Sequence, residues 1–250
     1  MGTSQSSNGP SSTVSLVPPW ADDQPQTPLP APIPGRFRQF RRSMTEYAKT
    51  GKKEQLKTAL GYYARTSTGG ATVAVRRFGN IIKVGGSLLG LLNTGQTQSH
   101  EPSLNLEQLS GKTSEEAISI IADALTPING DGERIRTSIN NALVDALDGI
   151  TKIDLSIMTD DILVSVLINY LTENIFLDVI LNSGNSLNNA NTVSEKIKME
   201  NDLHELIKVL ADTKVAVKLK NNIRSFAISQ IIELQRQIII EVWQEWENYH

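Results

Sequence analysis

The sequence predicts an all-α protein, an irregular helical bundle preceded by a disordered Pro/Ser-rich N-terminal tail. Three observations predict this class. Apolar residues recur at helical spacing over most of the chain, strand-like alternation is nearly absent, and eight of the ten prolines lie in the first 34 residues. We expect three parts: a disordered Pro-rich tail over 1–35, a basic helical segment over 36–92, and an acidic helical bundle over 103–250 that packs with the basic segment as one body.

The tail consists mostly of Pro, Ser, Thr, Gly and Gln, and its only charged residues are Asp22 and Asp23. Proline lacks the amide donor and polar residues offer little to bury, so we expect an extended, partly polyproline-like segment that belongs to no core. One apolar cluster interrupts it, formed by Val17, Pro18, Pro19 and Trp20. Two interpretations stay open for this cluster, a chance grouping or a peptide that docks to a partner.

The first helices are predicted from apolar spacing and from the placement of glycine. Residues 52–65 carry Leu56, Leu60 and Tyr63 at helical spacing. Residues 70–92 mix small and apolar side chains, and four glycines weaken a helix there. We interpret these glycines as sites of close helix packing or bending, because no phosphate-binding G-x-x-x-x-G-K-[ST] or G-x-G-x-x-G motif accompanies them.

Capping boxes and apolar periodicity predict the later helices. Thr113–Glu116 and Thr192–Glu195 match the Ser/Thr-x-x-Glu capping box and mark two helix starts. Residues 160–181 are apolar almost all round, which predicts a helix in the middle of the bundle. The other predicted elements are a helix with Ile135, Ile139, Leu143 and Leu147 that ends at Gly149, a loop over 182–191, a helix over 193–211, and a long last helix with Leu219, Ile223, Phe226, Ile231, Leu234, Ile238, Val242 and Trp246 on one side. Mean helix lengths then give about six to eight helices.

The net charge of −3 conceals a strongly polarised chain. Residues 36–83 contain twelve Lys/Arg against two Glu, a net charge of +10, whereas residues 84–250 have a net charge of −11. Aromatic residues are interleaved with the basic ones, the combination that nucleic-acid binding uses. Contact with acidic protein, within the chain or in a partner, is the other interpretation, and both stay open. The candidate basic patch is Arg36, Arg38, Arg41, Arg42, Arg76 and Arg77, and the interleaved aromatics are Phe37, Phe40, Tyr47, Tyr62, Tyr63 and Phe78.

Residues for catalysis or metal binding are scarce. The chain has no cysteine and three histidines, which excludes thiolate nucleophiles, disulfides and Cys-ligated zinc. His204-Glu205 begins an H-E-x-x-H zinc motif, but position 208 is Lys. We therefore expect no enzyme, no catalytic residue, no metal and no cofactor. Without an uncharged apolar run of 18 residues or a secretion signal, we expect a cytoplasmic protein that does not enter a membrane.

The extreme N-terminus carries the residues most open to modification. Removal of Met1 before the small Gly2 would expose a glycine α-amine with an ordinary pKa of about 7.7–8.0, partly neutral and nucleophilic at cellular pH. The start also fits M-G-x-x-x-[ST], the N-myristoylation pattern. A start without any role is the alternative.

Several segments resemble the QatB family, the B component of the bacterial four-gene Qat anti-phage defence system. They are MGTS at 1–4, LVPPW at 16–20 and YYARTSTGG at 62–70, and the resemblance covers about the first 90 residues. It implies three partners: a QueC-like enzyme (QatC), an ATPase (QatA) and a TatD-like nuclease (QatD). QueC chemistry activates the carboxylate of a 7-deazaguanine with ATP and passes it to ammonia, and a relative would pass it to a protein amine.

We therefore expect a non-enzymatic defence component with two working parts. The QueC-like partner would read the tail at Met1, Gly2, Thr3, Ser4, Val17, Pro18, Pro19 and Trp20, and would acylate Gly2 with the 7-deazaguanine. The helical body would dock the partners. The alternative is a nucleic-acid-binding subunit that uses the basic segment over 36–83.

Overall fold

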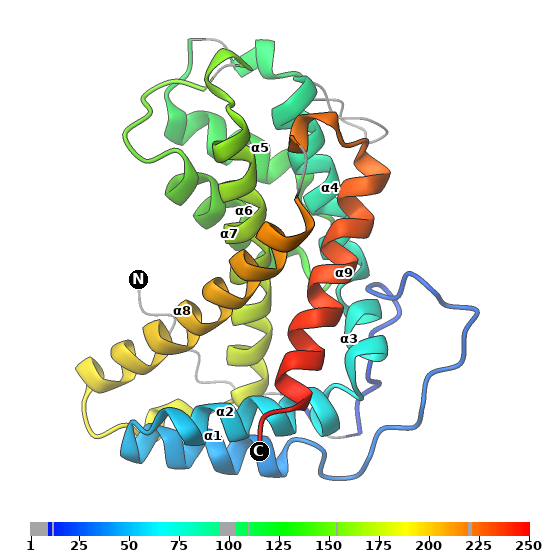
Figure 1. Cartoon of the computed structure of the whole chain (residues 1–250), viewed down its shortest axis with the longest axis vertical. Coiled ribbons are helices and arrows are strands. Elements are labelled where there is room, and N and C mark those ends of the chain that lie inside the picture. The colour runs from blue at the N-terminus through cyan, green and yellow to red at the C-terminus, as the bar shows by residue number, and fades with distance from the viewer. Residues whose placement is uncertain (1–9, 12, 96–103, 110, 154, 220–221) are drawn as a thin grey trace. The chain divides into compact units, whose positions relative to one another are not determined.

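The structure is a computed structural model that describes residues 10–11, 13–95, 104–109, 111–153, 155–219 and 222–250 (Figure 1). The described residues form nine α-helices and no strand, so the predicted all-α class is confirmed. The helices are α1 Arg38–Thr50, α2 Lys53–Tyr62, α3 Ala71–Arg77, α4 Gly79–Thr94, α5 Ser114–Leu125, α6 Gly132–Ala146, α7 Asp160–Ser183, α8 Val193–Lys218 and α9 Ile228–Glu247.

The chain's contacts divide it into two compact units. Unit one comprises Met1–Phe78, Ile175–Leu210 and Ile239–His250, and unit two comprises Gly79–Asn174 and Ala211–Ile238. Helices α7, α8 and α9 each contribute residues to both units. This grouping differs from the boundaries expected at residues 36, 92 and 103, which stay a prediction.

The core of unit one is built from aromatic side chains. Tyr63 lies at its centre, with ring centroids 4.7 Å from Phe40, 6.2 Å from Trp243 and 6.5 Å from Trp246. Phe78 packs edge-on against Trp243 at 5.3 Å, and all of these rings are fully buried. Aromatic pairs in such tilted or edge-on arrangements stabilise a core beyond their buried area. Five of the six aromatic residues that one interpretation of the sequence offered for stacking on nucleic acid are buried, which removes them from that role: Phe37, Phe40, Tyr47, Tyr63 and Phe78.

Unit two is aliphatic and closely packed around the glycines of α4. A Cβ atom at Gly85, Gly86 or Gly90 would meet side chains of α7 or α9 within 2.1–2.7 Å. The glycines thus allow close helix contact, as interpreted from the sequence, and they do not prevent α4 from forming a helix of 16 residues.

Both capping boxes form at the helix starts where the sequence predicts them. Thr113 accepts a hydrogen bond from the backbone N–H of Glu116, whose side chain accepts one from the N–H of Thr113, and α5 begins there. Thr192 and Glu195 form the same reciprocal pair at the start of α8. Both capping boxes are therefore confirmed.

The predicted last helix is confirmed over α9, but it is wrong at Leu219, Ile223 and Phe226, because the helical structure is interrupted between α8 and α9. Helix α8 extends to Lys218, a short 3₁₀ turn covers Ile223–Ser225, and α9 begins at Ile228. The Asn222 side chain accepts a hydrogen bond of 2.7 Å from the N–H of Arg224. Asparagine favours such local turns over a continuing helix, which explains the break.

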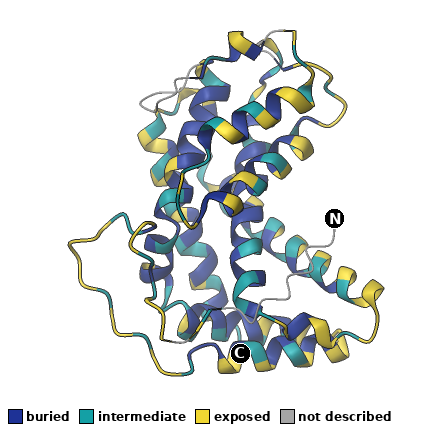
Figure 2. Cartoon of the chain, turned by 180° about the vertical axis from the view of Figure 1, so that it is seen from behind, coloured by how far each residue is buried: buried dark blue, intermediate teal, exposed yellow. Residues whose placement is uncertain are grey.

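The tail has no helix in its described part, residues 10–11 and 13–35, but it is not separate from the core. Val17 and Ala21 are buried at 2% and 1% exposure and pack with Val73 of α3, with Leu16 and Leu29 alongside. The expectation that the tail belongs to no core is therefore wrong for these residues. Residues 24–34 swing outward as a mostly exposed loop (Figures 1 and 2).

Helix α7 is the one described helix whose length and apolar composition would suffice to cross a membrane. Most of its apolar window, 72%, is buried inside the structure. Glu173 and Asp178 are among its buried residues, and carboxylates are unfavourable at a bilayer centre. These features match the core helix that the sequence predicts.

Candidate functional site

Met1, Gly2, Thr3 and Ser4 lie outside the described residues, and the first described residue of the tail is Pro10. Pro10 is held at its carbonyl, which accepts a hydrogen bond of 3.0 Å from Arg41 Nη2. Arg41 Nε donates to the carbonyl of Asn182 at 2.9 Å. Arg41 therefore ties the start of the described tail to the C-terminal end of α7.

The apolar cluster of the tail divides between core and surface. Val17 is buried, Pro18 is half-buried, and Pro19 and Trp20 are exposed, with Trp20 at 48%. Val17 thus serves the tail's own packing. Pro19 and Trp20 face outward, where a partner can reach them.

A buried ion pair anchors the tail four residues beyond Pro18. Arg76 donates from Nε and Nη2 to the two carboxylate oxygens of Asp22, at 2.9 and 2.7 Å. Arg76 Nη2 also donates to the carbonyls of Gln24 and Thr27, at 2.9 and 2.8 Å. Both side chains are less than a tenth exposed. The Arg76 hydrogen bonds hold the pKa of Asp22 below its ordinary value, so the carboxylate stays charged.

The six arginines of the candidate basic patch do not form one exposed surface. Arg36 and Arg76 are buried, and Arg41 and Arg77 are half-buried and bonded to other residues of unit one. Only Arg38 and Arg42 are exposed. Because the tail and the end of α7 supply the partners of Arg41, Arg76 and Arg77, these cations serve internal contacts, the interpretation that the sequence left open beside nucleic acid.

A cavity of about 280 Å³ lies between the tail and the helices of unit one. We call it the tail cavity. Its tail wall includes Pro10, Val14, Ser15, Leu16 and Pro18, and its helical wall includes Arg36, Phe37, Tyr63, Ser67, Thr68, Ala74, Arg77, Phe78, Asp178, Leu181, Asn182 and Trp243.

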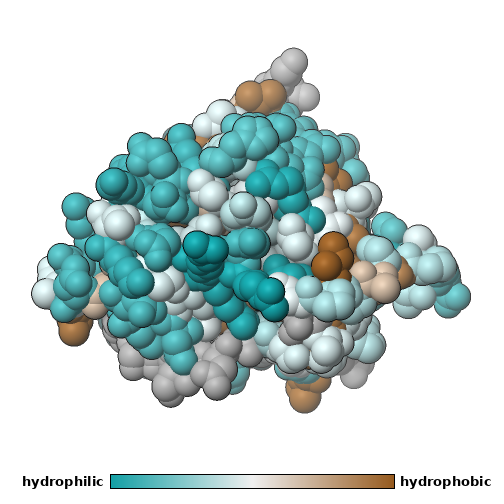
Figure 3. Space-filling view, turned by 90° about the horizontal axis from the view of Figure 1, so that it is seen from below, coloured by the Kyte–Doolittle hydropathy of each residue, from teal (hydrophilic) through white to brown (hydrophobic). Residues whose placement is uncertain are grey.

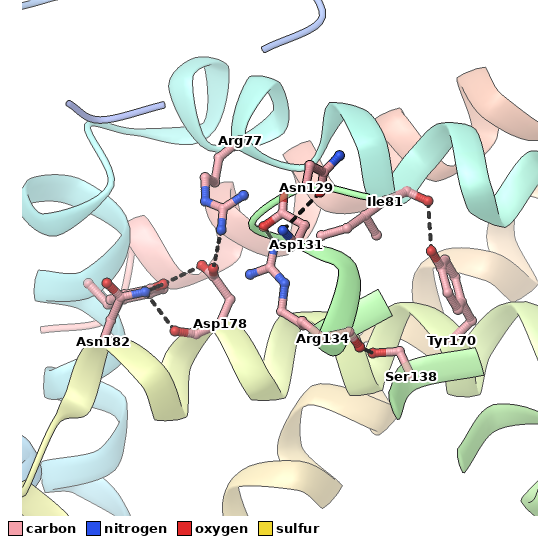
Figure 4. A network of polar contacts seen from close by, with 10 residues as sticks. Arg77, Ile81, Asn129, Asp131, Arg134, Ser138, Tyr170, Asp178 and Asn182 are labelled. Carbon is pink, nitrogen blue, oxygen red and sulfur yellow. Dashed lines mark hydrogen bonds and ion pairs between the residues drawn. The ribbon is translucent and has the colours of Figure 1, made fainter. Parts of the chain in front are cut away.

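Asp178 lines the tail cavity and takes part in a network of polar contacts (Figure 4). Its carboxylate accepts a hydrogen bond of 2.5 Å from the Tyr63 hydroxyl and lies 3.9 Å from Arg77 Nη2. Asn182 Nδ2 donates to the Tyr63 hydroxyl at 3.0 Å and to the Asp178 carbonyl at 2.7 Å. The Asp178 side chain is 5% exposed, and the hydrogen bond from Tyr63 and the charge of Arg77 help to compensate its burial.

Arg36, which the sequence placed in an exposed basic patch, is buried. Its side chain is 4% exposed, and its guanidinium lies 4.8 Å from the centre of the Phe37 ring. Burial lowers its pKa, yet arginine remains protonated at neutral pH. The sequence offered no signal for this burial, because arginine is usually exposed and no local pattern distinguishes a buried arginine from an exposed one.

Metal-binding groups are not assembled in the described part of the chain, where no cluster of three His, Cys, Asp or Glu occurs. His204 packs edge-on against Phe176 at 5.3 Å. This ring contact lies within unit one.

A family model described as "Qat anti-phage system associated protein QatB" matches residues 69–246. No curated protein matches. No solved structure matches either.

Proposed function

The chain belongs to the QatB family, which is associated with the Qat anti-phage system, and from this premise we propose that it is a non-enzymatic component of a bacterial anti-phage defence complex. A QueC-like partner, QatC, recognises the N-terminal tail and acylates Gly2 with a 7-deazaguanine group. The helical body docks the other components, the ATPase QatA and the TatD-like nuclease QatD. The complex works in the cytoplasm.

The anchoring of the tail is the observation that carries this proposal. Asp22 and Val17 fix the tail to α3, and Arg41 fixes Pro10. Eight residue-to-residue steps separate Gly2 from Pro10, and they span at most about 28 Å when fully extended. The tail thereby offers its terminal amine within a bounded distance of the body, so a partner that binds the body gains a high local concentration of the amine.

For the acylation of Gly2, this chain needs to supply only a neutral primary amine. The nitrogen of Gly2 attacks the activated acyl carbon of the 7-deazaguanine, an amide bond forms, the bond to the activating group breaks, and the amine loses one proton. Glycine has no side chain to hinder the approach, and its α-amine is partly neutral near pH 7–8. The activation step needs ATP and is the partner's work.

Intact-mass measurement of the chain co-expressed with QatC tests the modification. We expect a mass increase of one 7-deazaguanine acyl group, located by peptide mapping on the fragment that begins with Gly2. An N-terminal fragment of unchanged mass, from a preparation in which QatC is active, would overturn the proposal.

A matched pair of variants separates the amine from the rest of the tail. Gly2→Pro keeps the tail but replaces the primary amine with a hindered secondary one, so we expect no mass increase and loss of phage protection. Gly2→Ala keeps a primary amine and is expected to retain most of both. Protection that is equal in Gly2→Pro and the unchanged protein would contradict a required modification.

Nucleic-acid binding is the alternative, and one face of unit one offers exposed cations that would support it. Helices α1 and α2 lie side by side and present a largely hydrophilic surface (Figure 3). Its exposed cations are Arg38, Arg42, Lys49, Lys52, Lys53 and Lys57.

Fluorescence anisotropy with a labelled DNA duplex at 50 and 200 mM salt decides between the two. Under our proposal, binding is weak at both concentrations, and alanine at Arg38, Arg42, Lys53 and Lys57 leaves phage protection unchanged. Tight binding that falls about 10³-fold or more with salt, and is abolished with protection by the four substitutions, would favour the alternative.

A further inference from the structure

A buried cation lines the tail cavity, and two of its three nitrogens have no hydrogen-bond partner among the described residues. Arg36 is 4% exposed, and its Nε and Nη1 atoms have no hydrogen-bond partner among the described residues. Its third nitrogen, Nη2, donates a long bond of 3.4 Å to the carbonyl of Ser15. A buried hydrogen-bond donor that has no acceptor costs about 1–3 kcal/mol, and more when the donor is charged. Such an arrangement is stabilised when a bound group accepts from these atoms.

The charges around the cavity indicate which sign and size of charge would fit. Of the residues that the structure describes, three with charged side chains line it: Arg36, Arg77 and Asp178. Asp178 is paired with Arg77 and accepts from Tyr63, so Arg36 is left as an excess of one positive charge. A single negative charge balances it. A doubly charged phosphate would instead bring a second, uncompensated charge into the cavity.

The walls indicate the rest of the ligand. Leu16, Phe37, Ala74, Phe78 and Leu181 line the cavity with apolar surface. The hydroxyls of Ser67 and Thr68 are already bonded to backbone carbonyls. The volume of about 280 Å³ lies just below the range of about 300–1,000 Å³ that is usual for drug-sized ligands, which indicates a smaller ligand. We propose that the tail cavity binds a small organic carboxylate, with the carboxylate on Arg36 and an apolar or aromatic body between Leu16 and Phe78.

Ligand binding would be coupled to the docking of the tail. Residues Pro10, Val14, Leu16 and Pro18 form one wall of the cavity, so an undocked tail would leave the ligand without that wall. By linkage, a ligand that binds only the docked form stabilises that form. This site is independent of the modification proposed for Gly2, and either proposal can fail alone.

Isothermal titration of the full chain with benzoate and with benzamide tests the site. The two probes have the same shape and size, but only benzoate carries the negative charge. We expect saturable binding of benzoate, slower amide hydrogen exchange over residues 13–18 when it is bound, and at least tenfold weaker binding of benzamide. Equal affinities for the two probes, or no binding of either, would overturn the proposal.

The variant Arg36→Met removes the charge and keeps the length of the side chain. We expect benzoate binding to weaken about ten- to hundredfold, the usual range for a lost hydrogen bond to a charged group. The control is Arg38→Met, which removes an exposed arginine two residues away and is expected to bind benzoate as the unchanged protein does. Full benzoate affinity in folded Arg36→Met would overturn the assignment.

Two further experiments test the size of the cavity and the size of the ligand. Val14 lines the cavity and is 47% exposed, so Val14→Trp is expected to fold and to weaken benzoate binding by narrowing the cavity, even if Arg36→Met does not fold. A hexapeptide ending in a phenylalanine carboxylate carries the same chemistry on a body too large for 280 Å³. We expect it not to bind, and its binding in place of benzoate would overturn the proposal of a small free acid.

Discussion

Replacing Gly85 with alanine is expected to lower the free energy of unfolding by about 2–3 kcal/mol, although alanine favours a helix over glycine by about 1 kcal/mol. An added Cβ would lie 2.1 Å from Gln235 Oε1 and 2.7 Å from Tyr170 Cε1. Neither side chain has room to retreat, since Gln235 is 0% and Tyr170 1% exposed.

Both neighbours of Gly85 are also fixed by hydrogen bonds to α4 itself. The Tyr170 hydroxyl donates to the carbonyl of Ile81 at 2.9 Å (Figure 4), and Gln235 Nε2 donates to the carbonyl of Ile82 at 3.1 Å. Moving either side chain to admit a methyl group breaks one of these bonds and leaves a buried polar atom unsatisfied. The clash therefore costs more than the volume of one methyl group alone.

Urea denaturation of Gly85→Ala, with Gly90→Ala as the matched control, measures this effect. Gly90 lies on the same helix, and its added Cβ would meet the end of the half-buried Ile228 side chain at 2.6 Å. Because that end can rotate away, Gly90→Ala is expected to change stability by less than about 1 kcal/mol. Equal losses in the two variants would show that the close approach at Gly85 is not what determines stability.

Signals that act within a few residues were predictable from the sequence. The capping boxes at Thr113 and Thr192 depend on residues three positions apart, and both occur as expected. The helix over 160–181 was predicted from an apolar composition that only a buried helix tolerates. The break between α8 and α9 was missed because apolar spacing continues through Leu219, Ile223 and Phe226 and outweighed the turn signal of Asn222.

Long-range use of charged and aromatic residues was not predictable. Arg76 is buried by a pair with Asp22, 54 residues earlier in the chain, and no local pattern links the two. Tyr63 and Phe78 belong to the residue types that stack on bases and also to those that fill cores, and only tertiary packing decides between these uses. The tail cavity was missed for the same reason, because its two walls come from distant segments.

The family resemblance found in the sequence and the family match cover different parts of the chain. The motifs at 1–4 and 16–20 precede the matched residues 69–246, and the motif at 62–70 overlaps them by two residues. Family membership therefore depends mainly on the helices, whose sequence was too generic to recognise by its motifs. The tail motifs stay as the basis of the proposal on Gly2.

Breaking the Asp22–Arg76 pair by Arg76→Met is expected to release the tail. Removing one partner of a buried ion pair costs about 3–5 kcal/mol, because the other charge is left buried and unpaired. Asp22 avoids that cost by leaving α3 for water, so the loss in global stability is limited to the docking free energy of the tail. Hydrogen exchange over residues 17–27 reports the release directly and is expected to accelerate at least tenfold.

Acid should act on the same pair without any substitution. The folded pKa of Asp22 lies below its ordinary value of 3.8, so the pair's contribution is fully present above that pH and is lost as the pH falls through the lowered folded value. Tail exchange, corrected for its intrinsic pH dependence, is therefore expected to accelerate below about pH 3.8 in the unchanged protein and to be insensitive to acid in Arg76→Met.

The double variant Asp22→Leu/Arg76→Met separates the ion pair from simple loss of contacts. Replacing both buried charges with apolar side chains removes the unpaired charge, and such replacements are often neutral or stabilising. We expect the double variant to restore slow exchange over 17–27, while Asp22→Leu alone leaves Arg76 unpaired and the tail released. Asp23→Leu is the control, since it removes the neighbouring carboxylate, whose charge also raises the pKa of Arg76, and leaves the Asp22 hydrogen bonds in place. If the tail amides of the double variant exchange as fast as those of Arg76→Met, the apolar cluster around Val17 is not sufficient to hold the tail. The Asp22–Arg76 pair would then supply the docking free energy that positions the N-terminal segment for a partner.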